Sequence, residues 1–130
     1  MEKDTREIRK SFSFRVDKAN KVYTPLNWEL PKKTKYVRGI QLTSDFPHKL
    51  YFRGSQKIEI GGDELFPEGF DSKILVSSIS VAPRERFFEL GDVLPGDLSV
   101  KVRFEDKDHE RAGIGNGYNV SFVLLIDELI

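Results

Sequence analysis

The chain has 130 residues, of which 38% are hydrophobic and 32% are charged, a composition that fits one folded domain and excludes a disordered chain. Lys and Arg together number 21, as do Asp and Glu, so the formal net charge is zero, without the excess of cations that nucleic-acid binders use. Cysteine is absent, which excludes disulfides and thiolate chemistry.

The first ten residues, MEKDTREIRK, contain one strong hydrophobe and no apolar run of the kind found in a secretory signal. We interpret residues 1–10 as a charged N-terminal arm and residues 11–130 as a single domain. No apolar stretch approaches the roughly 20 residues that span a bilayer, so we expect no membrane association. We expect synthesis in the cytoplasm, and a secreted domain with its leader removed is the alternative.

Three segments in the first half of the chain indicate β-structure. From Ser11 to Val16, apolar and polar residues alternate with the period of two that a half-buried strand requires. Residues 22–30 contain Pro25 and are interpreted as an irregular or edge segment, because proline cannot donate to a central ladder. Residues 36–43 form the next expected strand.

Residues 50–52 and 58–60 flank a short segment that contains Gly54, and this pattern predicts a hairpin. The following stretch, GGDELFPEGFDS at residues 61–72, is expected to be a long loop. Its apolar residues predict that it docks on the body or forms a contact surface. They are Leu65, Phe66 and Phe70. The sequence around Glu64 is the best helix candidate, and it amounts to one turn.

Four strands are expected in the second half, at residues 74–81, 86–90, 98–104 and 118–126. The last of these is apolar on both faces, which predicts a central strand covered on both sides. Seven to nine short strands separated by turn residues predict an all-β fold, an antiparallel β-sandwich. A jelly roll is the first choice at this length. An immunoglobulin-like sandwich is the second, although it lacks the Cys-Trp-Cys signature.

No constellation for catalysis or metal binding is found. The two histidines, His48 and His109, lie in separate expected loops and supply neither a metal site nor a catalytic triad. The acids at 63–71 and 106–110 are expected in solvated turns, where the spacing fits neither a glycosidase pair nor a calcium loop. The glycines at 113–117 are expected in a flexible turn. We therefore predict no enzyme activity, no catalytic residue, no metal site and no cofactor.

Two binding interpretations remain open. In the first, the chain is a structural subunit that packs against copies of itself or other proteins. Its interface would use the apolar residues of the 61–72 loop together with those at the C-terminus, Leu129 and Ile130. In the second, Trp28 and Tyr23 stack on a carbohydrate, as exposed aromatic residues do in sugar-binding sandwiches. The competing interpretation of Trp28 is that it covers one end of the core.

The charged arm, the strand pattern over residues 11–127 and the GGDELFPEGF loop, without a site, resemble small single-jelly-roll virion proteins of bacteriophages, including vertex and decoration subunits. The resemblance implies a non-enzymatic subunit of a virion, made in the host cytoplasm and assembled as a homo-oligomer with other protein subunits. It rests on architecture, so no functional residues are carried over. A carbohydrate-binding module is the alternative.

Overall fold

The computed structural model describes residues 4–72, 75 and 87–130. These residues form eight strands and one short helix, which occur along the chain as follows: β1 (Thr5–Val16), β2 (Val22–Glu29), β3 (Thr34–Ser44), α1 (Pro47–Arg53), β4 (Gly54–Ile60), β5 (Asp63–Asp71), β6 (Phe88–Val93), β7 (Ser99–Asp106) and β8 (Tyr118–Leu129).

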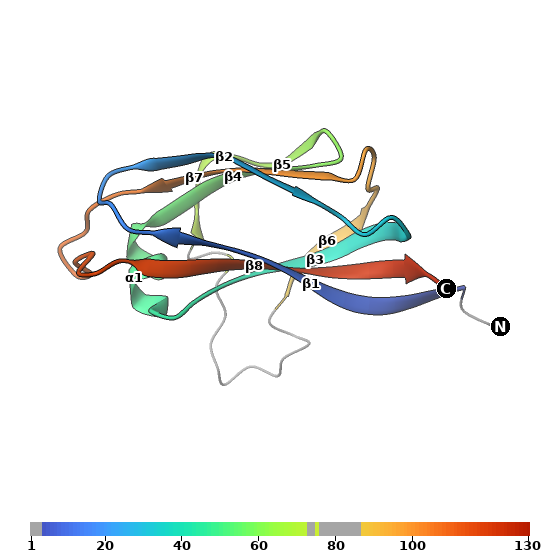
Figure 1. The fold of residues 1–130 in the computed structure, drawn as a ribbon, viewed down its shortest axis with the longest axis horizontal. Helices are drawn as coiled ribbons and strands as arrows, with labels where there is room; N and C mark the ends of the chain where they lie inside the picture. Colours follow the sequence, from blue (N-terminus) through green and yellow to red (C-terminus); the bar gives the residue numbers. More distant parts are fainter. Residues whose placement is uncertain (1–3, 73–74, 76–86) are drawn as a thin grey trace.

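The strands lie in two layers that face each other (Figure 1). One sheet has the order β1-β8-β3-β6 and the other has the order β2-β7-β4-β5, and all neighbours are antiparallel. The predicted antiparallel β-sandwich is therefore confirmed.

The order of the strands follows a simple rule. The pairs β1–β8, β2–β7, β3–β6 and β4–β5 are those of one long antiparallel ribbon whose tip is the β4–β5 hairpin. This ribbon is bent so that successive pairs fall alternately in the two sheets. The pairs β3–β8 and β4–β7 then join the ribbon into sheets of four strands.

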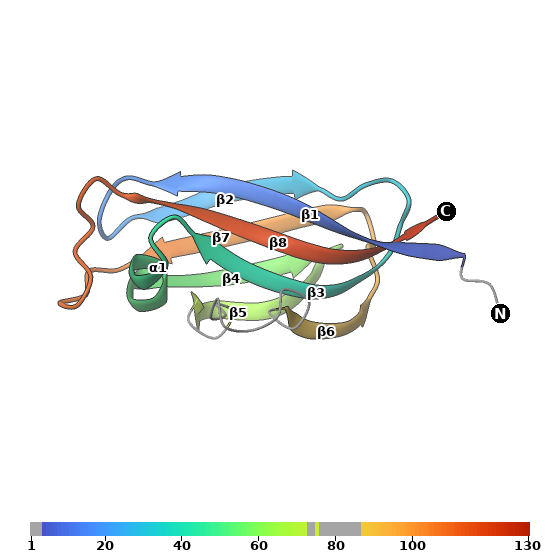
Figure 2. The same ribbon diagram turned by 90° about the horizontal axis from the view of Figure 1, so that it is seen from below.

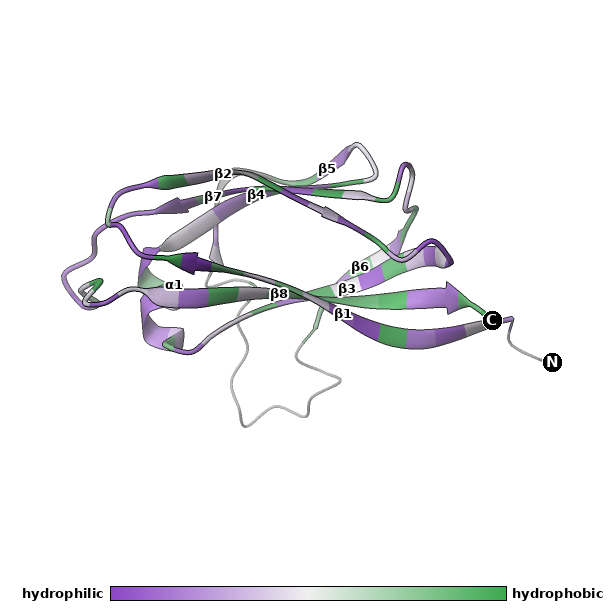
Figure 3. Ribbon diagram, viewed as in Figure 1, coloured by the Kyte–Doolittle hydropathy of each residue, from purple (hydrophilic) through white to green (hydrophobic). Residues whose placement is uncertain are grey.

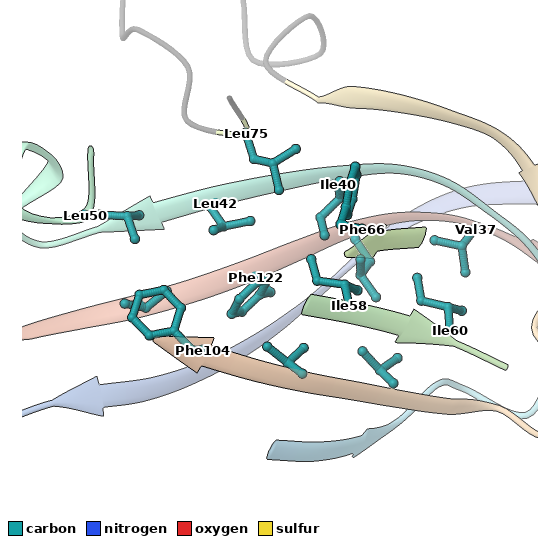
Figure 4. Close-up of a cluster of buried hydrophobic side chains, with 14 of the residues drawn as sticks. Val37, Ile40, Leu42, Leu50, Ile58, Ile60, Phe66, Leu75, Phe104 and Phe122 are labelled. Carbon is teal, nitrogen blue, oxygen red and sulfur yellow. The ribbon is translucent and has the colours of Figure 1, made fainter. Parts of the chain in front are cut away.

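The core lies between the sheets, where apolar side chains from both layers meet (Figure 4). In β7 the residues Val100, Val102 and Phe104 point inward, and in β8 Phe122 and Leu124 face them. Such alternation is what allows one face of each strand to be buried, and it is visible as alternating hydropathy along β1 (Figure 3).

The expectation that the last strand is central is also confirmed. β8 lies between β1 and β3 and pairs with both along its length. Leu125, which is on the face opposite the core, is still only 7% exposed.

The prediction of an arm at residues 1–10 is wrong for the described part of that segment. Thr5 to Lys10 belong to β1, with Thr5 opposite Leu129 and Lys10 opposite Leu124. Lys10 does not end the strand, because its ammonium group stays exposed while its stem lies beside Phe12, with Nζ 5.9 Å from the ring centroid.

The predicted hairpin at residues 50–60 is also wrong. Residues 47–53 form α1, with a proline in its first turn, and the hairpin lies further along the chain between β4 and β5. A helix of seven residues is too short for a periodic pattern to be recognised in the sequence. The expected loop at 61–72 consists mostly of β5, including its Glu64–Phe66 segment. The expected strand at 74–81 lies outside the described residues except for Leu75, which is buried.

Two turns touch at one end of the sandwich. Gly61 and Gly96 both have positive φ, at 60° and 52°. A Cβ on Gly96 would lie 2.4 Å from the carbonyl oxygen of Gly61, and a Cβ on Gly61 would lie 2.5 Å from that of Pro95. Only glycine allows the backbones of the β4–β5 and β6–β7 turns to approach so closely.

Candidate interaction surfaces

One side of the sandwich is formed by the edge strands β1 and β2, whose inward side chains are only partly covered. We call it the β1–β2 side. Its apolar side chains pack against the core but remain half-buried; they are Ile8, Phe12, Phe14, Tyr23, Leu26 and Trp28. By contrast, the inward residues of the central strands β7 and β8 are almost fully buried. An edge strand has a neighbour on one flank only, so part of each aromatic ring stays open to solvent.

The aromatic rings on this side form a connected group across the two sheets. Trp28 stacks on Phe12 with centroids 5.1 Å apart, and Phe14 lies 5.2 Å from Phe104 in an edge-to-face arrangement. Aromatic pairs of this kind contribute about 0.5–1.5 kcal/mol beyond their buried area. The group packs β1 against β2 and against the core.

The backbone of β1 presents an unused ladder at its outer edge. Ile130 N donates to Asp4 O (3.0 Å), whereas Leu129 N donates to Lys33 O (2.8 Å), so consecutive residues at the end of β8 bond to opposite sides. Because the β1–β8 register has no shift, this alternation continues along the strand. Even-numbered residues of β1 therefore bond to β8. The odd-numbered ones, such as Arg9, Ser11 and Ser13, direct their N–H and C=O groups to the open edge.

The other edge strands carry prolines, register shifts or a glycine that discourage pairing, and β1 carries none of these. β2 contains Pro25 and its register shifts between Tyr23 and Leu26. β5 contains Pro67 and has two register shifts against β4. β6 has six residues and includes Gly91 at a φ of 78°. β1 has twelve residues with neither proline nor glycine. Proteins usually protect edge strands with prolines, bulges and short lengths.

The two residues predicted to stack on a sugar, Trp28 and Tyr23, are placed inside this aromatic group. One face of the indole of Trp28 is covered by Phe12. The hydroxyl of Tyr23 accepts hydrogen bonds from the backbone N–H groups of Asp17 and Lys18, both at 3.0 Å. Tyr23 thus fixes the turn between β1 and β2, and the placement of Trp28 agrees with the interpretation that it covers the edge of the core.

The predicted interface residues are separated in the structure. Phe66 is 5% exposed and packs edge-to-face on Phe88, and Leu65 is half-buried against the core. The side chain of Phe70 lies outside the described part of the chain. Leu129 and Ile130 are exposed, at 42% and 78%, at the far end of β8. The structure therefore does not bring the two predicted groups into one surface, because the 61–72 segment is a strand of the sandwich and not a protruding loop.

At the opposite end from Ile130, α1 is tied to the sandwich by a buried ion cluster. Arg53, whose side chain is fully buried, donates from Nε and Nη2 to both oxygens of Asp106 at 3.0 and 2.8 Å. The Tyr118 hydroxyl also donates to Asp106, and Arg53 donates further to Asp108 and to the carbonyl of Ala112. This cluster joins α1, β7, β8 and the loop between them.

The ionisation of the cluster follows from these contacts. The hydrogen bond to Asp106 holds the pKa of Arg53 above its usual range. The pKa of Asp108 is lowered by its hydrogen bonds from Arg53 and Asn20. Burial, reinforced by the hydrogen bond to Asp106, raises the pKa of Tyr118 far above its ordinary value. Arg53, Asp108 and Tyr118 are thus each held in the form that the hydrogen bonds require, as expected for a structural cluster.

The acids considered for calcium are used in this cluster or lie at its edge. Asp106 and Asp108 both bind Arg53, which supplies the cation. His48 contacts Phe46, and His109 packs on Phe52 at 4.8 Å and accepts a hydrogen bond from Arg111 N. Within residues 4–72, 75 and 87–130 no group of three or more His, Cys, Asp or Glu side chains is placed to hold a metal ion.

A shallow hollow of about 230 Å³ lies on the outer face of the β2-β7-β4-β5 sheet. Its lining is mostly polar and includes three cationic side chains: Thr24, Asn27, Lys57, Glu59, Lys101, Val102 and Arg103. Lys57 is paired with Glu59 at 3.4 Å. The sequence alternation places Lys101 and Arg103 on the polar face of their strand but does not indicate that they gather with Lys57 in a depression.

No helix in the described residues is long and apolar enough to cross a membrane. Comparisons with models of protein families, with curated proteins and with solved structures give no match.

The sequence does not indicate the open edge of β1 as long as residues 1–10 are interpreted as an arm. The signal was present in the pattern: between Thr5 and Val16 no proline or glycine interrupts the chain. Ile8 continues the apolar set of Phe12, Phe14 and Val16 once Lys10 is allowed to lie at the edge.

Proposed function

We propose that this protein is a non-enzymatic structural subunit of a larger protein assembly, a virion component of a bacteriophage. The single observation that carries the proposal is the β1–β2 side, where a twelve-residue edge strand without proline, glycine or bulge lies beside half-buried aromatic rings. Another chain can add a strand to such an edge, and the presence of an edge without proline, glycine or bulge supports a binding role for it.

We also infer that the sandwich is a jelly roll. The four ribbon pairs, from β1–β8 at the base to β4–β5 at the tip, support this inference. Jelly rolls recur in viral capsid proteins and lectins, so the inference agrees with an assembly role without deciding it. The virion location rests on the architectural resemblance drawn from the sequence.

The assembly role is tested by light scattering of the purified full chain over a hundredfold range of concentration. We expect a mass at least twice that of one chain. A mass of one chain throughout would overturn the proposal. The virion location is tested separately, by mass spectrometry of phage particles purified from cells that carry the gene, and absence of the chain from these particles would refute it.

Carbohydrate binding is the second candidate, favoured by the hollow on the outer sheet face. Its Asn27, Lys57 and Glu59 side chains are of the kind that hydrogen-bond sugar hydroxyls. A glycan array would test it, with Lys101→Ala as the variant in the hollow and Lys35→Ala, on β3, as the matched control. Binding by the control and loss in the hollow variant would favour this candidate over the assembly role.

A further inference from the structure

The open edge of β1 has a register in which it complements itself. A strand that pairs with its own copy does so antiparallel around a two-fold axis, so the residue at the axis faces itself. Hydrogen bonds form only when the residues whose backbone groups point outward lie directly opposite each other. In β1 these are the odd-numbered residues, as the bonds of Leu129 and Ile130 establish.

Charge then selects among the possible registers. An axis at Arg9 or Lys10 places that cation against its own copy, and an axis at Phe12 places Arg9 opposite Arg15. Like charges directly opposite each other are destabilising in a sheet. An axis at Ser13 avoids these pairs but overlaps only residues 10–16.

An axis at Ser11 sets no two like charges directly opposite each other and gives a longer overlap than the axis at Ser13. It overlaps residues 6–16 and places Glu7 opposite Arg15 of the second copy, once on each side of the axis. On the core side it places Ile8 opposite Phe14, and Lys10 opposite Phe12, whose ring already lies within 5.9 Å of the Lys10 ammonium of its own chain. The half-buried rings of the β1–β2 side would be covered by the same contact.

We propose that two copies of this chain pair antiparallel through β1 with the axis at Ser11, so that two β1-β8-β3-β6 sheets become one continuous sheet. The inference rests on the proposed assembly role and specifies its first contact. The occupant is a second copy because this register places the one acid of the strand, Glu7, opposite Arg15 of the copy on each side of the axis and sets no two cations directly opposite each other. Protection of the other edges by prolines and register shifts leaves β1 as the described edge suited to this pairing.

The chain has no cysteine, so single cysteines report on the register. Ser11 and Ser13 are both exposed and lie on the same face of β1. In the proposed register the two copies of Ser11 are directly opposite, with Cα atoms about 5.5 Å apart, within the range of a disulfide. The two copies of Ser13 are displaced by four residues, roughly 13 Å, and cannot be bridged.

We expect Ser11→Cys to form a disulfide-linked dimer under mild oxidation at least tenfold faster than Ser13→Cys. In denaturing urea the two variants should oxidise at equal rates, which controls for the reactivity of the thiols. Equal rates in the native state, or faster linking of Ser13→Cys, would overturn the proposed pairing.

The outcome also separates this proposal from the assembly role. A wild-type chain that is oligomeric by light scattering, but whose Ser11→Cys variant does not link, would refute the β1 contact and leave the assembly role intact. A chain that stays monomeric and links at neither position would refute both.

Discussion

The α1 end of the sandwich and the β1–β2 side treat polar groups in opposite ways. At the α1 end, Arg53 and Asp106 are fully buried and each makes several hydrogen bonds within the chain. Along β1, by contrast, the backbone groups of residues such as Ser11 face outward, and within the described residues no backbone bond is made to them.

The comparison shows which region satisfies its polar groups within the chain and which region leaves them to water or to a partner. A buried charge must be matched inside the fold, because leaving it alone costs several kcal/mol. An edge strand can leave its groups to water at little cost and can exchange water for another chain. The α1 end satisfies its buried charges within this chain, whereas the β1–β2 side is suited to a partner. Figure 2 shows α1 at one end of the sandwich and β1 and β2 running along one side.

The sharpest test of this contrast is Arg53→Leu, which leaves Asp106 buried without its cation. We expect a loss of about 3–5 kcal/mol in the free energy of unfolding, measured by urea denaturation. The control is Arg6→Leu, which removes the exposed ion pair with Glu128 and should cost about 1 kcal/mol or less. Equal losses in the two variants would mean that the buried cluster contributes no more to the free energy of unfolding than the exposed ion pair does.

Proline substitutions in β1 test which backbone N–H groups of this edge strand bond to β8 and which face outward. In Lys10→Pro the lost N–H is one that bonds to β8, so the free energy of unfolding should fall by about 1–2 kcal/mol. In Ser11→Pro the lost N–H points outward, so stability should change little while the light-scattering mass falls to that of one chain. The reverse order of stabilities would show that the alternation assigned to β1 is wrong.

Alkaline pH probes the cluster at the α1 end through Tyr118. Its pKa in the folded state is raised above the value of about 10 that it has in the unfolded chain. The resulting stability is fully present below about pH 10 and is lost as pH rises toward the folded pKa. Urea titrations from pH 8 to 11.5 should show a smaller loss in Tyr118→Phe than in the wild type. If the free energy of unfolding falls with pH as steeply in Tyr118→Phe as in the wild type, the loss at alkaline pH does not come from Tyr118.

The smallest expected effect concerns the charges of the proposed dimer. Glu7→Arg and Arg15→Glu each place like charges opposite each other and should weaken dimerisation several-fold, about 0.2–1 kcal/mol for each exposed pair. The double variant restores opposite charges and should recover the wild-type dissociation constant, measured by analytical ultracentrifugation. Additive losses in the double variant would contradict the axis at Ser11.

Much of the architecture was predictable from alternation alone. The strands at 98–104 and 118–126 have apolar residues at every second position, and the central position of β8 followed from its second apolar face. The helix at Pro47–Arg53 was not predictable, because Leu50 and Arg53 are buried by contacts with distant parts of the chain. The pairing of Arg53 with Asp106, 53 positions apart, likewise leaves no local pattern.

The interaction surfaces were harder to predict for a related reason. Leu65 and Phe66 are expected in a loop that docks on the body or forms a contact surface, because GGDELFPEGFDS has the composition of a loop. In the structure β4 provides a ladder that the backbone of this segment joins. Local turn chemistry was overridden by pairing within the sheet. Leu129 and Ile130 are exposed although their backbones still bond to Lys33 and Asp4, so their exposure follows from their place at the end of the sandwich and not from a local pattern.

The contact between Gly61 and Gly96 sets a practical limit on how the molecule can be labelled. Turns are ordinarily the places where peptide tags and fluorescent reporters are inserted, but here two turns share a space that admits no Cβ atom. An insertion at Gly61 or Gly96 would force the two turns apart. Gly113, at which an added Cβ meets no atom within 4 Å and φ is not in the positive region, is a position that can accommodate a reporter.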